Sequence, residues 1–195
     1  MRGRGSTKWA WQRVVPAVLG VALVTGCTGG EPQAAESTPP PVADAPPTPT
    51  PVVLPERPAA MSEPTTDGAI AAATYFLQLY DYAFSVRDAE SLLSMSAEAC
   101  KFCNYVDESV AELVASGHTS VGPPVRVVSA MSTEIRPDEW FSARLQVEQD
   151  PTRELAADGT VVSESEANVT DFIFALSWLG DRWKIEAVDL AVIEQ

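Results

Sequence analysis

The prolines are spread very unevenly along this chain, and this limits which part of it can fold. Eleven of the 16 prolines lie between Thr28 and Thr66, in stretches such as STPPPVADAPPTPTPVVLP. No apolar period runs through this part of the sequence, so it cannot bury enough surface to offset its ordering entropy. Proline also favours the extended polyproline II conformation, at about 3.1 Å per residue. We therefore expect residues 27–66 to form a disordered tether and the folded domain to occupy residues 67–195.

The segment before the tether has the pattern of an export signal. Residues 1–13 carry four basic residues and no acidic one. They are followed by Val14–Thr25, an apolar run of 12 residues. A membrane-spanning helix needs roughly 20 such residues, so the run fits the apolar core of a signal peptide. We predict that residues 1–26 form this signal.

The apolar run ends in Leu-Val-Thr-Gly-Cys, which looks like the lipobox of bacterial lipoproteins. The resemblance implies cleavage between Gly26 and Cys27 and attachment of a diacylglyceryl group to the Cys27 thiol. Two acyl chains suffice for stable anchoring, since each buried CH₂ contributes about 0.8 kcal/mol. The alternative is an ordinary secretory signal with an unpaired Cys27. We expect an extracytoplasmic protein that binds the membrane through this lipid anchor.

The charge of the chain argues against nucleic acid as a partner. The net charge is −14, and beyond residue 26 only 9 Lys and Arg face 27 Asp and Glu. Binding to nucleic acid needs a basic footprint that releases counterions, and this chain has none.

Beyond Asp67 the apolar period changes from helical to strand-like. Apolar residues repeat at spacings of three and four from residue 69 to 85, which predicts a long helix. A short helix is expected within 87–96 and a third within 97–116, capped by Ser96. Spacings of two then predict antiparallel strands. The predicted strands cover 125–135 and 140–149, a hairpin turning at Asp158-Gly159, and two long strands turning at Gly180-Asp181.

This order of elements predicts an α+β domain, and it resembles the NTF2-like, or cystatin-like, cone fold. The long helix, the short helix and the closing hairpin LGDRWKIEAVDL carry that resemblance. It implies three N-terminal helices packed in one curved antiparallel sheet. The stretch SAEACKFC, with the lipobox and the tether, is also similar to a family of uncharacterised actinobacterial lipoproteins. That family has no established activity, and it implies a Gram-positive source.

Cys100 and Cys103 lie one helical turn apart, at a separation that suits a disulfide. Thiols oxidise outside the cytoplasm. If Cys27 carries the lipid, Cys100 and Cys103 are the two cysteines left to pair. A structural disulfide is the leading interpretation. A thioredoxin-like redox site and a zinc site are the alternatives, although the first expects a preceding strand. The second lacks another ligand pair, since His118 is the single histidine.

No catalytic, metal or cofactor motif occurs in the sequence, so we predict no cofactor, no metal and no named catalytic residue. His118 follows the third predicted helix and is expected in an exposed loop or as a partner of the dipole at the helix C-terminus. Cone folds also include enzymes that act inside their cavity. Tyr75, Asp81 and Tyr82 are therefore candidate cavity-lining residues, although aromatic residues at helical spacing usually belong to the core.

Three functions follow as hypotheses. The first is a membrane-anchored, non-catalytic module that binds an envelope protein or a small ligand. The second is an enzyme acting on a small apolar substrate in the cone cavity, which would require a buried carboxylate with a raised pKa. The third is a structural or assembly module that forms a homodimer.

Overall fold

The computed structural model describes residues 52–192. The predicted signal peptide, the lipidation and cleavage site at Gly26 and Cys27, and most of the tether lie outside the described residues. No helix within residues 52–192 is both long and apolar enough to cross a bilayer.

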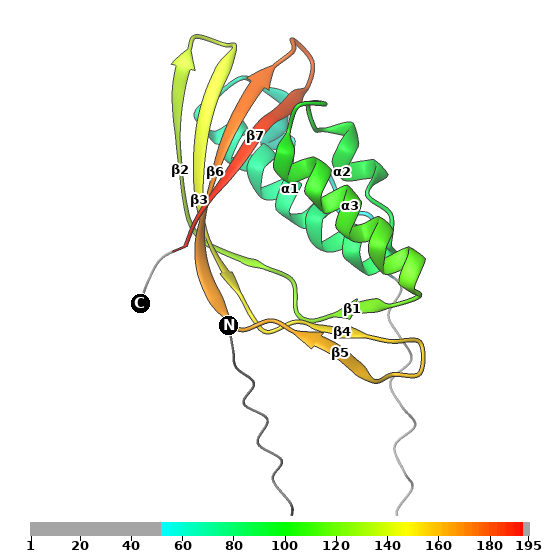
Figure 1. Cartoon of the computed structure of the whole chain (residues 1–195). Helices are drawn as coiled ribbons and strands as arrows, with labels where there is room; N and C mark the ends of the chain where they lie inside the picture. Colours follow the sequence, from blue (N-terminus) through cyan, green and yellow to red (C-terminus); the bar gives the residue numbers. More distant parts are fainter. Residues whose placement is uncertain (1–51, 193–195) are drawn as a thin grey trace, which may run out of the picture. The chain divides into compact units, whose positions relative to one another are not determined.

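The described chain is an α+β domain in which helices precede strands, as predicted (Figure 1). The elements are η1 (Ala59–Ser62), α1 (Thr66–Val86), α2 (Glu90–Ser94), α3 (Lys101–Ser116), β1 (Thr119–Val121), β2 (Arg126–Arg136), β3 (Trp140–Gln149), β4 (Arg153–Leu155), β5 (Val161–Glu164), β6 (Asn168–Trp178) and β7 (Trp183–Val192).

The strands form two antiparallel sheets, which corrects the expectation of one curved sheet. The larger sheet has the order β2-β3-β6-β7 and the smaller one the order β1-β4-β5. The pairing of the β3–β6 ribbon continues in the same register into the β4–β5 hairpin. Gln149 faces Asn168 before the break, and Arg153 faces Glu164 after it. Pro151 lies in the break, where it has no N–H to give to the ladder. One long ribbon is thus interrupted at this position and divided between two sheets.

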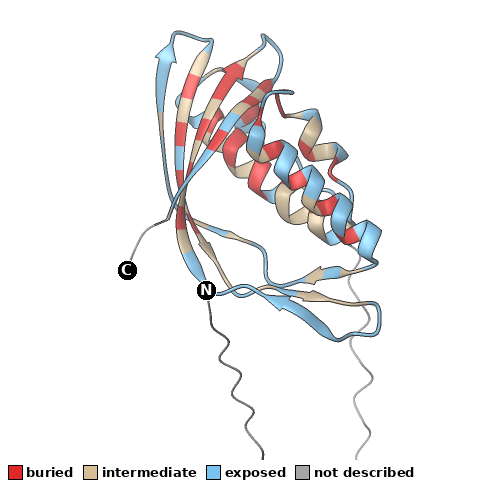
Figure 2. Cartoon of the chain, viewed as in Figure 1, coloured by how far each residue is buried: buried red, intermediate tan, exposed pale blue. Residues whose placement is uncertain are grey.

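The core lies between the helices and the larger sheet, where buried side chains concentrate (Figure 2). Alternate residues of β3 and β6 point into it, and α1 packs on β2 and β3. Phe76 of α1 meets Phe174 of β6 edge to face at 5.8 Å between ring centroids. The prediction of three helices packed on the sheet is corrected, because the five-residue α2 packs against α1 and α3.

The folded part of the chain begins before Asp67, which corrects the predicted boundary. Met61 of η1 is buried in the core, and Thr65 caps α1 by accepting a hydrogen bond from Gly68 N at 3.0 Å. A Cβ at Gly68 would lie 2.2 Å from the backbone oxygen of Glu63. The absence of a side chain at Gly68 therefore lets the segment before α1 fold back against the helix.

Candidate functional site

A cleft of about 590 Å³ lies next to the interruption between the two sheets. Its walls come from the segment 52–55, the C-terminal half of α1, the loop joining β1 to β2, and residues at the break in the ribbon. We call it the α1 cleft. Its volume falls within the roughly 300–1,000 Å³ of pockets that hold small-molecule ligands.

Helix α1 contributes a polar stripe to the cleft. Gln78, Asp81, Tyr82 and Ser85 all line it, and their spacing places them on one face of the helix. Most of α1 is apolar and packs into the core. A polar stripe on such a helix is unexpected unless it faces water or a ligand.

Asp81 has the most perturbed carboxyl group of the described residues. It is partly buried, and its Oδ2 accepts a hydrogen bond from the backbone N of Val125 at 3.1 Å. Burial raises the pKa of Asp81 to about 6, and the hydrogen bond from Val125 offsets this in part. The carboxyl group therefore changes charge close to neutral pH, unlike an ordinary surface aspartate.

The loop opposite Asp81 is held close to the sheet break by its small and rigid residues. A Cβ at Gly122 would lie 2.6 Å from Cγ2 of Thr152, so the loop can approach Thr152 this closely only with glycine there. Pro123 and Pro124 follow and line the cleft. Because proline has a fixed φ, this wall is stiff, and it presents apolar surface beside the Asp81 carboxyl group.

The charge of the cleft is negative. Asp81 and Asp150 line it, and among residues 52–192 no Lys, Arg or His does. Asp150 Oδ2 is 3.9 Å from Nη2 of Arg126, which lies closer to Glu148, at 2.8 Å. Burial, followed by the neighbouring Asp81 charge, raises the pKa of Tyr80 to about 12, so this phenol stays neutral. The cleft thus combines two carboxyl groups with neutral polar and apolar walls.

The three predicted cavity-lining residues do not share one cavity. Asp81 and Tyr82 line the α1 cleft. Tyr75 lines a separate pocket and its hydroxyl donates to the backbone oxygen of Pro55 at 3.3 Å. The space between α1 and the larger sheet, where a cone-fold substrate was expected, is packed with aromatic side chains such as Phe76 and Phe174. The cleft lies instead at the break between the sheets.

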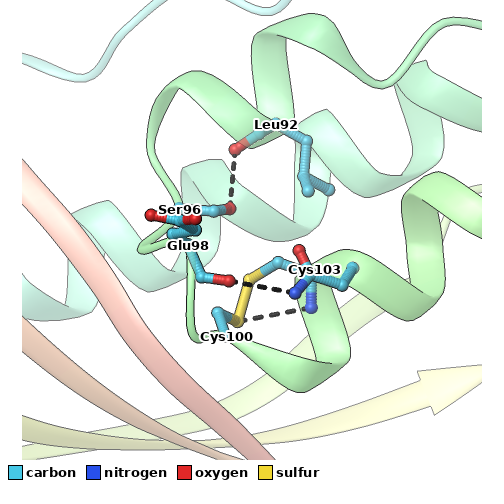
Figure 3. The surroundings of a disulfide bond; sticks show 6 residues. Leu92, Ser96, Glu98, Cys100 and Cys103 are labelled. Carbon is cyan, nitrogen blue, oxygen red and sulfur yellow. Dashed lines mark hydrogen bonds between the residues drawn. A yellow bond between two sulfur atoms is a disulfide. The ribbon is translucent and has the colours of Figure 1, made fainter.

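Cys100 and Cys103 form a disulfide, with an S–S distance of 2.05 Å and Cα atoms 5.3 Å apart (Figure 3). Both residues are completely buried. Helix α3 begins at Lys101, later than the predicted residue 97, because Cys100 is its N-cap. The predicted cap Ser96 instead donates to the oxygen of Leu92 at 2.9 Å. The disulfide therefore fixes the first turn of α3 from inside the core.

His118 lies in the loop after the C-cap of α3, as expected, but it is only partly exposed. Its Nδ1 lies 2.6 Å from Oε1 of Glu154, so the pair ties the end of α3 to β4. Glu154 also accepts a hydrogen bond from Ser163 Oγ at 3.2 Å. Within residues 52–192 no group of three His, Cys, Asp or Glu side chains could hold a metal ion.

Fold and cleft together define an α+β domain with an acidic, ligand-sized cleft beside its long helix. The chain belongs to DUF6318, a family of unknown function, whose family model matches residues 41–189. No curated protein matches the chain.

Several solved structures resemble the domain. An uncharacterised protein with a cystatin-like fold from Caulobacter vibrioides is 12% identical, with 63% of this chain and 88% of that chain covered and a TM-score of 0.43. The intermembrane space region of the chloroplast protein ARC6 is also 12% identical, with 67% and 98% covered and a TM-score of 0.48. A putative scytalone dehydratase from Novosphingobium aromaticivorans is 11% identical, with 65% and 85% covered and a TM-score of 0.40.

Proposed function

We propose that this protein is a lipid-anchored lipoprotein on the outer face of a Gram-positive cell membrane, and that its NTF2-like domain binds a small ligand without catalysis. The ligand occupies the α1 cleft. One observation carries the binding site: the half-buried Asp81 carboxyl group lies in a cleft that no basic residue of the described chain lines.

The chemistry of the cleft selects a class of ligand. An ionised carboxylate that is partly removed from water is costly unless a positive charge or several donors face it. Asp81 receives one backbone donor, from Val125. A ligand with an ammonium group would supply the missing positive charge, and an apolar body would cover Pro124 and Phe84, which also line the cleft. We therefore propose a small organic cation as the ligand.

The position at the membrane rests on the sequence. The lipobox-like residues before Cys27 support the anchor. The proline-rich stretch after Cys27 supports a spacer whose length can reach about 3.1 Å for each residue. Formation of a homodimer and binding of an envelope protein remain predictions that this proposal does not include.

Benzylammonium is a suitable probe, because it joins one positive charge to one apolar ring. Isothermal titration of the purified full-length protein is expected to show binding that weakens about tenfold between pH 7.5 and pH 5, as Asp81 takes up a proton. The Asp81→Asn variant should lose most of the affinity. Asp189→Asn, at an exposed position of β7 that does not line the cleft, is the matched control. Equal affinity in all three proteins would refute the site.

Catalysis is the second candidate, and one observation favours it. A carboxyl group with a pKa of about 6 suits a general base near neutral pH. A substrate that binds at pH 7.5 and is recovered chemically unchanged after long incubation supports the binding function, whereas turnover that disappears in Asp81→Asn supports the enzyme.

A further inference from the structure

A second pocket, of about 240 Å³, lies apart from the α1 cleft. It is enclosed by the segment before α1, by α1 itself, by α2 and by the turn that joins β6 to β7. We call it the Arg57–Arg182 pocket. Its lining residues include Arg57, Tyr75, Ser91 and Arg182, and its floor is Met61, Leu79 and Trp183. The two pockets share no lining residue.

The charge of this pocket is opposite to that of the rest of the chain. Two arginines line it, and among the described residues no Asp or Glu does. Beyond residue 26 acidic residues outnumber basic ones by 27 to 9. Two guanidinium groups at one small acid-free pocket are therefore unlike the remaining surface.

Neither arginine is neutralised by a strong partner within residues 52–192. Arg57 has no ion pair or side-chain hydrogen bond there. Arg182 contacts only its chain neighbour Asp181, with 3.4 Å between Nη1 and Oδ1, and both side chains are exposed. Such exposed pairs contribute little, so both guanidinium groups are available to an incoming anion.

The floor of the pocket is apolar, and one of its residues carries a hydrogen-bond donor without a partner. Met61, Leu79 and Trp183 are almost completely buried. The indole Nε1–H of Trp183 is buried and has no acceptor among the described residues. A buried donor without a partner is unfavourable, but this N–H has almost no accessible surface, so a ligand does not reach it directly. The two guanidinium charges are what favours a negative ligand.

We propose that the Arg57–Arg182 pocket binds a small monocarboxylate. The carboxylate meets the two guanidinium groups, whose planar donors match its geometry, and a short apolar body lies on the floor. The volume is below the roughly 300 Å³ at which drug-sized ligands are accommodated, so the ligand is small. This site goes beyond the proposed function, because it differs from the α1 cleft in position and in the sign of its charge.

Sodium benzoate is the probe, titrated calorimetrically into the purified full-length protein, with benzyl alcohol as the uncharged analogue. Benzoate is expected to bind about tenfold more tightly than benzyl alcohol. Arg57→Gln and Arg182→Gln should each weaken benzoate binding about fivefold. Both side chains are exposed, so the variants retain the fold. Arg153→Gln, an exposed arginine of β4 that lines neither pocket, is the matched control.

The two sites are tested independently by measuring the binding of both probes to each variant. Asp81→Asn should leave benzoate binding unchanged, and Arg57→Gln should leave benzylammonium binding unchanged. No binding of benzoate, equal binding of benzoate and benzyl alcohol, or equal losses in Arg57→Gln and Arg153→Gln would each overturn the proposal. If the native protein binds benzoate but not benzylammonium, the proposal for the α1 cleft is refuted and the proposal for the Arg57–Arg182 pocket is not.

Discussion

Replacing Asp81 with Asn is expected to stabilise the protein at neutral pH. Burial raises the pKa of Asp81 from 3.8 to about 6. A raised folded-state pKa means that the stabilising contribution of this group is complete below about pH 4. That contribution is lost as the pH rises through 6. Above pH 6 the ionised carboxylate therefore lowers the free energy of unfolding. Asparagine has no such effect, because it is neutral at every pH.

The size of the effect follows from the shift. About two pKa units correspond to about 3 kcal/mol at 1.36 kcal/mol per unit. Asp81 keeps part of its surface in water, and solvent screening reduces this to about 1–2 kcal/mol. The asparagine side-chain oxygen can still accept the hydrogen bond from Val125 N. We expect Asp81→Asn to be about 1–2 kcal/mol more stable at pH 8 and equal to the native protein at pH 3.5.

Urea unfolding followed by tryptophan fluorescence measures this difference, with Trp183 as a buried reporter. Asp81→Ala is the control, because it removes the charge together with the acceptor of the Val125 N–H. It should gain less stability than Asp81→Asn, since a lost buried hydrogen bond costs about 1 kcal/mol. A native protein and an Asp81→Asn variant with parallel stability curves from pH 3.5 to pH 8 would refute the reasoning.

Three other predictions concern the disulfide, the segment before α1 and the anchor. Replacing Cys100 and Cys103 by serine should lower the free energy of unfolding by about 2 kcal/mol, which urea titration measures; no change would contradict a structural role. Gly68→Ala should cost about 1–3 kcal/mol in the same assay, because the new Cβ meets the backbone oxygen of Glu63. Cys27→Ala should move the protein from the membrane fraction to a non-membrane fraction after cell fractionation, and continued membrane association would contradict lipid anchoring.

The strands of the larger sheet were predictable because they depend on a local pattern, the alternation of apolar and polar residues along the chain. The predicted range 140–149 coincides with β3, and the two predicted glycine turns are present, with positive φ at Gly159 and Gly180. The start of the folded chain was not predictable in this way. Met61 lies among prolines and alanines, and its burial depends on the close approach at Gly68, which involves two segments that no local period relates.

The candidate site was predictable only in part, and for a related reason. Asp81 was a candidate cavity-lining residue on the predicted long helix. Its partners come from the loop at Gly122 and from the sheet break at Pro151, which lie 41 and 70 residues further along the chain. The sequence pattern placed neither of them near the long helix. Their position beside α1 follows from the division of one ribbon between two sheets, and that division depends on long-range pairing.

The stability argument for Asp81 also bears on function. Local choices in a folded sequence normally agree with one another, and departures concentrate at functional sites. At neutral pH the Asp81 carboxylate lowers stability, although asparagine would fit the same hydrogen bond to Val125. A group whose charge costs stability in the free protein is understandable if a ligand compensates that charge when it binds. Benzylammonium should therefore raise the melting temperature of the native protein more than that of Asp81→Asn, because binding to the folded state alone stabilises it.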